Sequence, residues 1–99
     1  MLRLAFSEAR ATAGAVVHGN VHAPDDVDVA VELVRVERSP AGFATYHVAT
    51  AELGDDGSFE LVVPDDTPPD VVGHECSLHY ALRAISRDEE VREAFAVAP

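Results

Sequence analysis

Histidine and cysteine are the residues in this chain that are best suited to binding a metal ion. His18 and His22 stand four residues apart in a segment where apolar and polar residues alternate. In an extended chain, at ~3.3 Å per residue, two such side chains are about 13 Å apart, which is too far to share one ion without ligands from a partner strand. His74, Cys76 and His79 form a second group, but alternation places His79 on one face and Cys76 toward the core. Neither a paired-cysteine nor a His-Glu-x-x-His spacing occurs, so we predict no metal site and no cofactor.

Three pairs of adjacent aspartates could instead suggest calcium, which prefers clustered carboxylate oxygens. The pairs are Asp25 and Asp26, Asp55 and Asp56, and Asp65 and Asp66. If two of the loops lie at one end of a sandwich, they could form the calcium site of a C2-like or other immunoglobulin-like ligand-binding module. Aspartate is also favoured in turns because its carboxylate accepts hydrogen bonds from nearby backbone amides. We take turn formation as the main interpretation and keep calcium binding as the alternative.

The nucleophilic side chains do not stand in a recognisable catalytic context. Ser58, Ser77 and Cys76 lie outside any nucleophile elbow or triad spacing. The segment "GSFELVV", residues 57–63, lacks the pattern that holds phosphate groups. We therefore predict that the protein is not an enzyme.

The charge of the chain is strongly acidic. Eighteen aspartates and glutamates face seven arginines and no lysine, which gives a formal net charge of −11. Such a surface repels nucleic-acid phosphates and anionic lipid headgroups, so we predict no nucleic-acid partner and no membrane insertion. The first residues do not resemble a signal peptide and no run is long enough to span a bilayer, so we expect a cytoplasmic protein. High solubility and an acidic face that selects a basic partner remain two explanations of the charge.

The elements that must position these residues are short strands, because apolar residues recur at every second position along most of the chain. Two segments, residues 5–13 and 87–97, are also compatible with helical spacing, and we favour a strand for the second. The alternating segments are residues 2–7, 15–22, 27–36, 43–53, 59–63, 76–85 and 91–97.

Turn sequences separate these segments, and no gap between them suits a crossover helix. Such spacing indicates an antiparallel sandwich or barrel. At 99 residues, the chain is expected to form one domain over residues 1–99. We predict an all-β, antiparallel, immunoglobulin-like sandwich of about seven strands.

One strand departs from strict alternation. After Leu33 the apolar positions change phase to Val34 and Val36, as a β-bulge or a strand that is apolar on both faces would produce. Val34 and Val36 could form an interface with a partner, or they could cover a second core face through a bulge. Both interpretations stay open.

An ordered set of segments resembles the arrestin-like family, including the alpha-arrestins and the bacterial sporulation-control type. Near the middle, "FELVVP" is followed by "PPDVVG" and "LHYALRAI". Upstream, "AGAVVHGNVHA" and "VDVAVELVRV" occupy the places of the first strands of that family. The resemblance covers residues 13–87, with Asp70 where the family usually has serine and Val71 where an aromatic residue is common.

The resemblance implies a single arrestin-like, immunoglobulin-like sandwich, equivalent to one half of an arrestin, that serves as a non-catalytic adaptor or scaffold. The loop with Pro64, Pro68 and Pro69 would then be a rigid crossover between the two sheets. Exposed sheet edges are templates for a strand from a partner or from a second copy. We therefore expect a protein partner of unknown identity or a two-fold homodimer.

Overall fold

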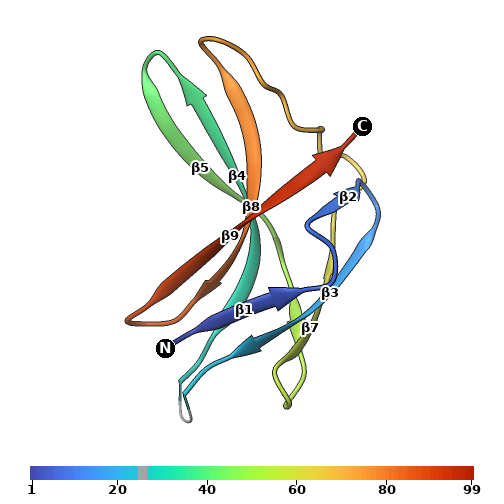
Figure 1. The fold of residues 1–99 in the computed structure, drawn as a ribbon, viewed down its shortest axis with the longest axis vertical. Coiled ribbons are helices and arrows are strands. Elements are labelled where there is room, and N and C mark those ends of the chain that lie inside the picture. The colour runs from blue at the N-terminus through green and yellow to red at the C-terminus, as the bar shows by residue number, and fades with distance from the viewer. Residues whose placement is uncertain (25–26) are drawn as a thin grey trace.

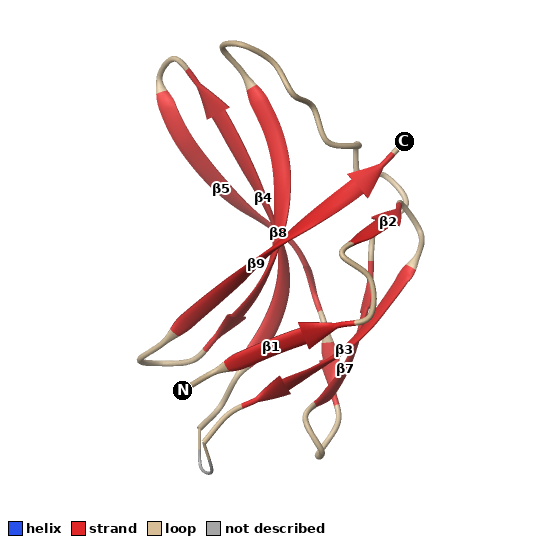
Figure 2. Cartoon of the chain, in the orientation of Figure 1, coloured by secondary structure: helices blue, strands red, loops and turns tan. Residues whose placement is uncertain are grey.

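The protein is an all-β structure with two sheets (Figures 1 and 2), seen in a computed structural model that describes residues 1–24 and 27–99. The predicted all-β class is confirmed, since the described residues contain strands and turns but no helix. The strands are β1 (Arg3–Phe6), β2 (Arg10–Thr12), β3 (Val16–His22), β4 (Ala30–Ser39), β5 (Gly42–Thr50), β6 (Glu52–Leu53), β7 (Ser58–Val62), β8 (Ser77–Ile85) and β9 (Glu90–Ala98).

The strands form a four-stranded sheet in the order β1-β3-β7-β6 and a five-stranded sheet in the order β2-β9-β8-β4-β5. Neighbours pair antiparallel except β2 and β9, which are parallel. The arrangement is consistent with a β-sandwich. It also corrects the strand count, because β2 and β6 are too short to give an alternating pattern in the sequence.

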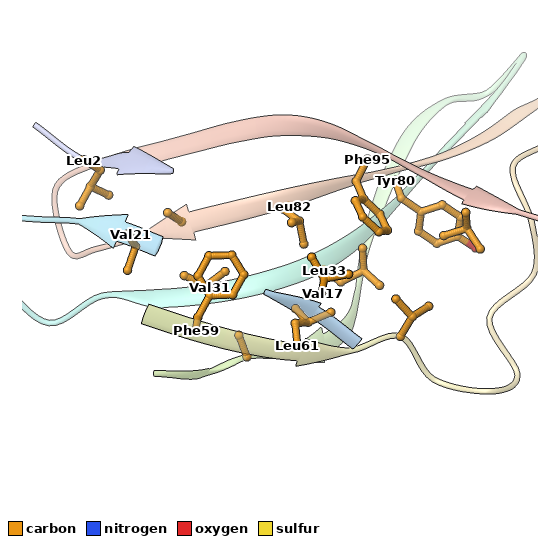
Figure 3. Packing of buried hydrophobic residues seen from close by; sticks show 14 residues of the cluster. Leu2, Val17, Val21, Val31, Leu33, Phe59, Leu61, Tyr80, Leu82 and Phe95 are labelled. Atoms are coloured by element: carbon orange, nitrogen blue, oxygen red, sulfur yellow. The ribbon is translucent and has the colours of Figure 1, made fainter. Parts of the chain in front are cut away.

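The core lies between the two sheets and is built from the alternating side chains of both (Figure 3). Phe59 and Leu61 of β7, with Val63 just beyond it, are buried, as are Tyr80 and Leu82 of β8, whereas Leu78 near the start of β8 is half-buried. Burying each of the large side chains contributes roughly 1.5–3 kcal/mol. The core therefore orients β7 and β8 toward each other.

The ends of the sequence lie in strands that contact one another. Residues 5–13 contain part of β1 and all of β2 rather than a helical turn, and β9 confirms the strand interpretation of the C-terminal segment. β2 pairs with Ala96–Ala98 of β9, and Leu2 N donates to Glu89 Oε2 at 2.9 Å. β2 is thus paired with the last strand, and a hydrogen bond joins the residues that directly precede β1 and β9.

The predicted continuous strand over residues 43–53 divides at Ala51. The Ala51 N–H donates to the Val31 carbonyl at 2.8 Å, and the next two residues pair with β7 in the other sheet. Since β5 belongs to the five-stranded sheet and β6 to the four-stranded sheet, the chain changes layer at this residue.

The proline-rich segment connects β7 in one sheet to β8 in the other, which agrees with the predicted crossover. Three contacts hold it. The Tyr80 hydroxyl donates to the Pro68 carbonyl at 2.6 Å, and Val71 forms an isolated bridge with Leu78. Asp70 Oδ1 accepts from the Val97 N–H at 2.9 Å, while the Asp70 N–H donates to the Val97 carbonyl at 3.0 Å.

Replacing Tyr80 with phenylalanine is expected to lower the free energy of unfolding by about 0.5–1.5 kcal/mol, because the loop loses its hydrogen bond to β8. Burial raises the pKa of Tyr80 above its ordinary value of 10.0. The unfolded chain therefore ionises first as the pH rises, and the stability that the neutral phenol gives is present below pH 10 and lost above it. Chemical denaturation at pH 8 and at several values above pH 10 measures the free energy of unfolding. The difference in this free energy between Tyr80→Phe and the wild type should become smaller as the pH rises above 10. Tyr46→Phe is the matched control, and an equal loss in both variants would contradict the role of the Pro68 contact.

Candidate functional site

The two predicted histidine groups are not brought together as metal sites. His18 Nε2 lies 3.5 Å from Glu60 Oε2 on the neighbouring strand, and both side chains are largely exposed. His74 and His79 are exposed as well. Within residues 1–24 and 27–99, no three metal-ligating side chains form a cluster.

Cys76 is exposed, so the prediction that it faces the core is wrong. β8 begins only at Ser77, and Cys76 belongs to the end of the preceding loop, where strand periodicity does not apply. Ser77 is half-buried at the start of the strand. Ser58 Oγ donates to Asp56 Oδ1 at 2.6 Å, which makes it part of a turn.

Of the aspartate pairs, the second shows turn chemistry directly. Asp56 Oδ1 accepts hydrogen bonds from the Ser58 N–H at 3.0 Å and from the Ser58 hydroxyl at 2.6 Å. These bonds favour the ionised carboxylate and lower the pKa of Asp56 below its ordinary value of 3.8. The carboxylate thus closes the turn before β7.

The third pair lies at the opposite end of β7. The side chain of Asp65 lies beside Gly14, whereas the turn with Asp56 lies beside Val21, whose N–H donates to the Gly57 carbonyl at 2.8 Å. The five residues of β7 separate the two pairs by at least about 15 Å. They cannot share one calcium ion, and the first pair, Asp25 and Asp26, lies outside the described residues.

Replacing Asp56 with alanine is expected to lower the melting temperature at neutral pH, because the turn loses both hydrogen bonds to Ser58. Since the pKa of Asp56 is lowered on folding, its contribution is present above pH 3.8 and lost as the pH falls through the folded-state pKa. The difference in melting temperature between Asp56→Ala and the wild type should therefore shrink below pH 3.8. Asp55→Ala removes the same charge at the adjacent position. An equal decrease in melting temperature in Asp55→Ala would mean that the loss of a negative charge, and not the loss of the hydrogen bonds to Ser58, causes the effect.

The residues proposed for an interface, Val34 and Val36, lie on the outer face of the five-stranded sheet. β4 pairs with β8 without interruption, and Val34 stands opposite Ala81 while its neighbour Leu33 stands opposite the buried Leu82. Val34 is fully buried in the single chain, and Val36 is half-buried. Their use in an interface stays a prediction.

The change of phase after Leu33 does not arise from a bulge in β4. The register shift is between β4 and β5, where Leu33 pairs with Ala49 and Val34 with His47, so that Val48 is the extra residue. On β4 itself, Arg35 follows the buried Leu33 on the inner face. The inner face of β4 thus becomes polar where its outer face becomes apolar.

That polar change marks the end of the core. In Figure 1 the β4–β5 hairpin and the start of β8 extend beyond the four-stranded sheet. Several large apolar side chains are exposed on this extension and on the loop beside it. They are Phe43 (75% exposed), Tyr46 (46%), Val71 (52%) and Val72 (96%).

A groove of about 400 Å³ runs across the extension. Ala44 and Tyr46 of β5, Leu78 of β8 and Val71 of the loop line it, together with Glu37. A smaller notch of about 270 Å³ lies between the bulge of β5 and the proline loop, and His47 and Val48 of β5 are among its lining residues. Two hollows therefore adjoin one strand, β5.

Tyr46, which lines the groove, contacts a side chain of the neighbouring strand. The Arg35 guanidinium carbon lies 4.9 Å from the centroid of the Tyr46 ring, a contact that favours the cation over the ring face. Arg35 Nε is also 3.0 Å from Glu37 Oε2. Because its charge is balanced there, Arg35 holds the ring without adding net charge to the surface.

A larger but more open hollow of about 740 Å³ lies on the four-stranded sheet. His18, Glu60, Glu52, Ser58 and Asn20 are among the residues that line it. Glu52 and Glu60 are directly opposite each other on β6 and β7. At this hollow Ser58 is bonded to Asp56, and His18 lies near Glu60.

β5 is the edge of the five-stranded sheet and pairs with β4 alone. Residues 39–51, which include all of β5, contain no aspartate, glutamate, arginine or lysine, although a quarter of the whole chain is charged. Charged side chains, shortness and covering elements are the usual protections of an edge strand. The body of β5 before Val48 has none of them.

The other edges in the described part of the chain are protected. β6 has two residues and carries Glu52, and β1 has four residues and carries Arg3. β9 carries Glu90, Arg92 and Glu93, and β2 covers its C-terminal part. The open edge at β5 is therefore a local property of this strand. Sequence reasoning missed it, although the uncharged run from residue 39 to residue 51 was a visible signal.

In the part of the chain that the structure describes, no helix is both long and apolar enough to cross a membrane. The chain matches no family model, and no curated protein matches it either.

Proposed function

We propose that this protein is a non-catalytic interaction domain, an adaptor or scaffold built like one immunoglobulin-like half of an arrestin. Its binding element is the open edge of β5, where an extended protein segment adds a strand to the five-stranded sheet. The unprotected edge of β5 is the observation that carries the proposal.

The backbone of an edge strand offers N–H and carbonyl groups on the side away from its neighbour. A partner strand satisfies these groups, which provides affinity that does not depend on the sequence of the partner. Over Gly42–His47 the strand carries no charged aspartate, glutamate, arginine or lysine that would oppose a partner. This segment thus provides about six residues for pairing before the bulge at Val48.

The hollows beside β5 provide a place for alternate side chains of the added strand. Ala44 is half-buried in the groove and Tyr46 forms its rim. An added strand would place every second side chain on this face, where Leu78 and Val71 present apolar surface. We infer that the partner segment carries apolar side chains at alternate positions.

The proposal is tested by placing a lysine on the edge. Thr45 is exposed at the middle of β5, and Thr45→Lys places a charge of the type that protects natural edges. Val16→Lys is the matched control because Val16 is an exposed strand residue in the other sheet. Both variants add one positive charge to the same chain.

Each protein is used to capture binding proteins from cells of its source, and the bound proteins are quantified by mass spectrometry. A partner that the wild type and Val16→Lys capture, and that Thr45→Lys loses at least tenfold, supports the edge. Purified partner should then protect backbone amides of residues 42–47 from hydrogen exchange. Equal capture by all three proteins, or protection confined to other strands, would refute the proposal.

A further inference from the structure

We propose that the strand that adds to β5 is the β5 strand of a second copy, which joins two five-stranded sheets in an antiparallel, two-fold dimer. This inference names the occupant of the edge and rests on the proposed function of β5 as the binding element. Three observations lead to it: the distribution of charge, the position of the bulge and the pattern of large and small side chains.

Charge restricts where two copies can meet. Each copy has a net charge of −11, so most isologous contacts would bring carboxylates together, and like charges that stand directly opposite across strands are destabilising. Pairing β6 with itself would bring Glu52 near its copy, and pairing β9 would bring in Glu90 and Glu93. β5 can pair with itself without introducing a carboxylate from either strand.

Geometry then fixes the register. When a two-fold axis relates two antiparallel strands of one sheet, residues opposite each other must lie on the same face of that sheet. Their numbers therefore sum to an even value, and one residue stands opposite its own copy across the axis. The regular part of β5 between Gly42 and the bulge at Val48 has Thr45 at its centre. Centring on Thr45 uses five residues of each strand, from Phe43 to His47.

In this register the opposite side chains fit in size and chemistry. Thr45 stands opposite its own copy, which is a favourable cross-strand pair. On the same outer face, Phe43 stands opposite His47 of the second copy, which places two rings side by side. On the inner face, Tyr46 stands opposite the small Ala44 beside the groove. About four to six backbone hydrogen bonds would form across the axis.

The Arg35 contact prepares Tyr46 for this pairing. Because Arg35 already lies against the ring at 4.9 Å, less side-chain freedom is lost when the second strand arrives. The two Tyr46 rings and the two Ala44 residues alternate on one face. Each ring therefore covers part of the apolar surface beside the other copy's groove.

The dimer has a distinctive dependence on salt. The net negative charges of the two copies, −11 each, repel each other over the Debye length, which is about 8 Å at 0.15 M salt and about 3 Å at 1 M. Self-pairing of two acidic chains should therefore become tighter at high salt, whereas binding of a basic partner would become weaker. This sign separates a second copy from a basic protein segment.

The first measurement is sedimentation equilibrium at 0.15 M and 1 M sodium chloride over a wide range of protein concentrations. The wild type and Val16→Lys should dimerise, more tightly at 1 M, and Thr45→Lys should dimerise at least tenfold more weakly. Both variants lower the net negative charge from −11 to −10. The lower net charge by itself favours association. Weaker dimerisation in Thr45→Lys but not in Val16→Lys must therefore result from the position of the lysine on β5.

The second measurement tests the register. Thr45→Cys is made in a Cys76→Ser background, so that the new cysteine is the single thiol in the chain. Cβ atoms directly opposite across antiparallel strands are about 4.5–5.5 Å apart, within reach of a disulfide after small adjustment. Mild oxidation should link Thr45→Cys into dimers much faster than Phe43→Cys or Tyr46→Cys, or than Val72→Cys in the exposed loop.

The outcomes separate this inference from the proposed function. A wild type that stays monomeric at every concentration and at both salt concentrations, or equal crosslinking at all four positions, overturns the β5–β5 dimer. If β5 amides are nevertheless protected by another captured protein, the edge remains the binding element and only its occupant is wrong. If neither self-association nor protection involves β5, both proposals fail.

Discussion

The structure depends on burying one face of β4 and β8 against β3 and β7. The two long strands pair from Ala30 and Ile85 to Arg38 and Ser77, but β3 and β7 have only seven and five residues. The residues on the inner face of β4 match this difference in length. They are valine and leucine in the first part of the strand and arginine and glutamate in the second part. The apolar core therefore stops partway along the five-stranded sheet, and the exposed hairpin is a direct result of where it stops.

The parts of the fold that follow from strand periodicity were predictable from the sequence. Phe59 and Leu61, like Tyr80 and Leu82, stand at alternating apolar positions of the sequence, and all four are buried in the structure. Cys76 was assigned wrongly because the same alternation was extended past the true start of β8 at Ser77. Periodicity describes a residue only while the chain remains in a sheet.

Features that depend on long-range pairing were less visible. β2 has three residues and is defined by its position beside β9, so it has no pattern of its own. The change of phase at Val34 was read as a bulge or as an interface, since a single strand does not show which of its neighbours is irregular. The open edge has the same origin. The uncharged run that contains β5 is plain in the sequence, but the run acquires meaning only when the sheet order places β5 at an edge.

The contact between the two ends of the sequence has a consequence for the order of folding. The β4–β5 hairpin is local and can form early, whereas β1 and β2 are held partly by Glu89 and β9. Contacts between residues far apart in sequence slow folding, because the loop must close before they can form. During synthesis the hairpin and its bare edge should thus exist before the rest of the sandwich closes. The growing chain should then expose the edge of β5 for a time before its own core is complete.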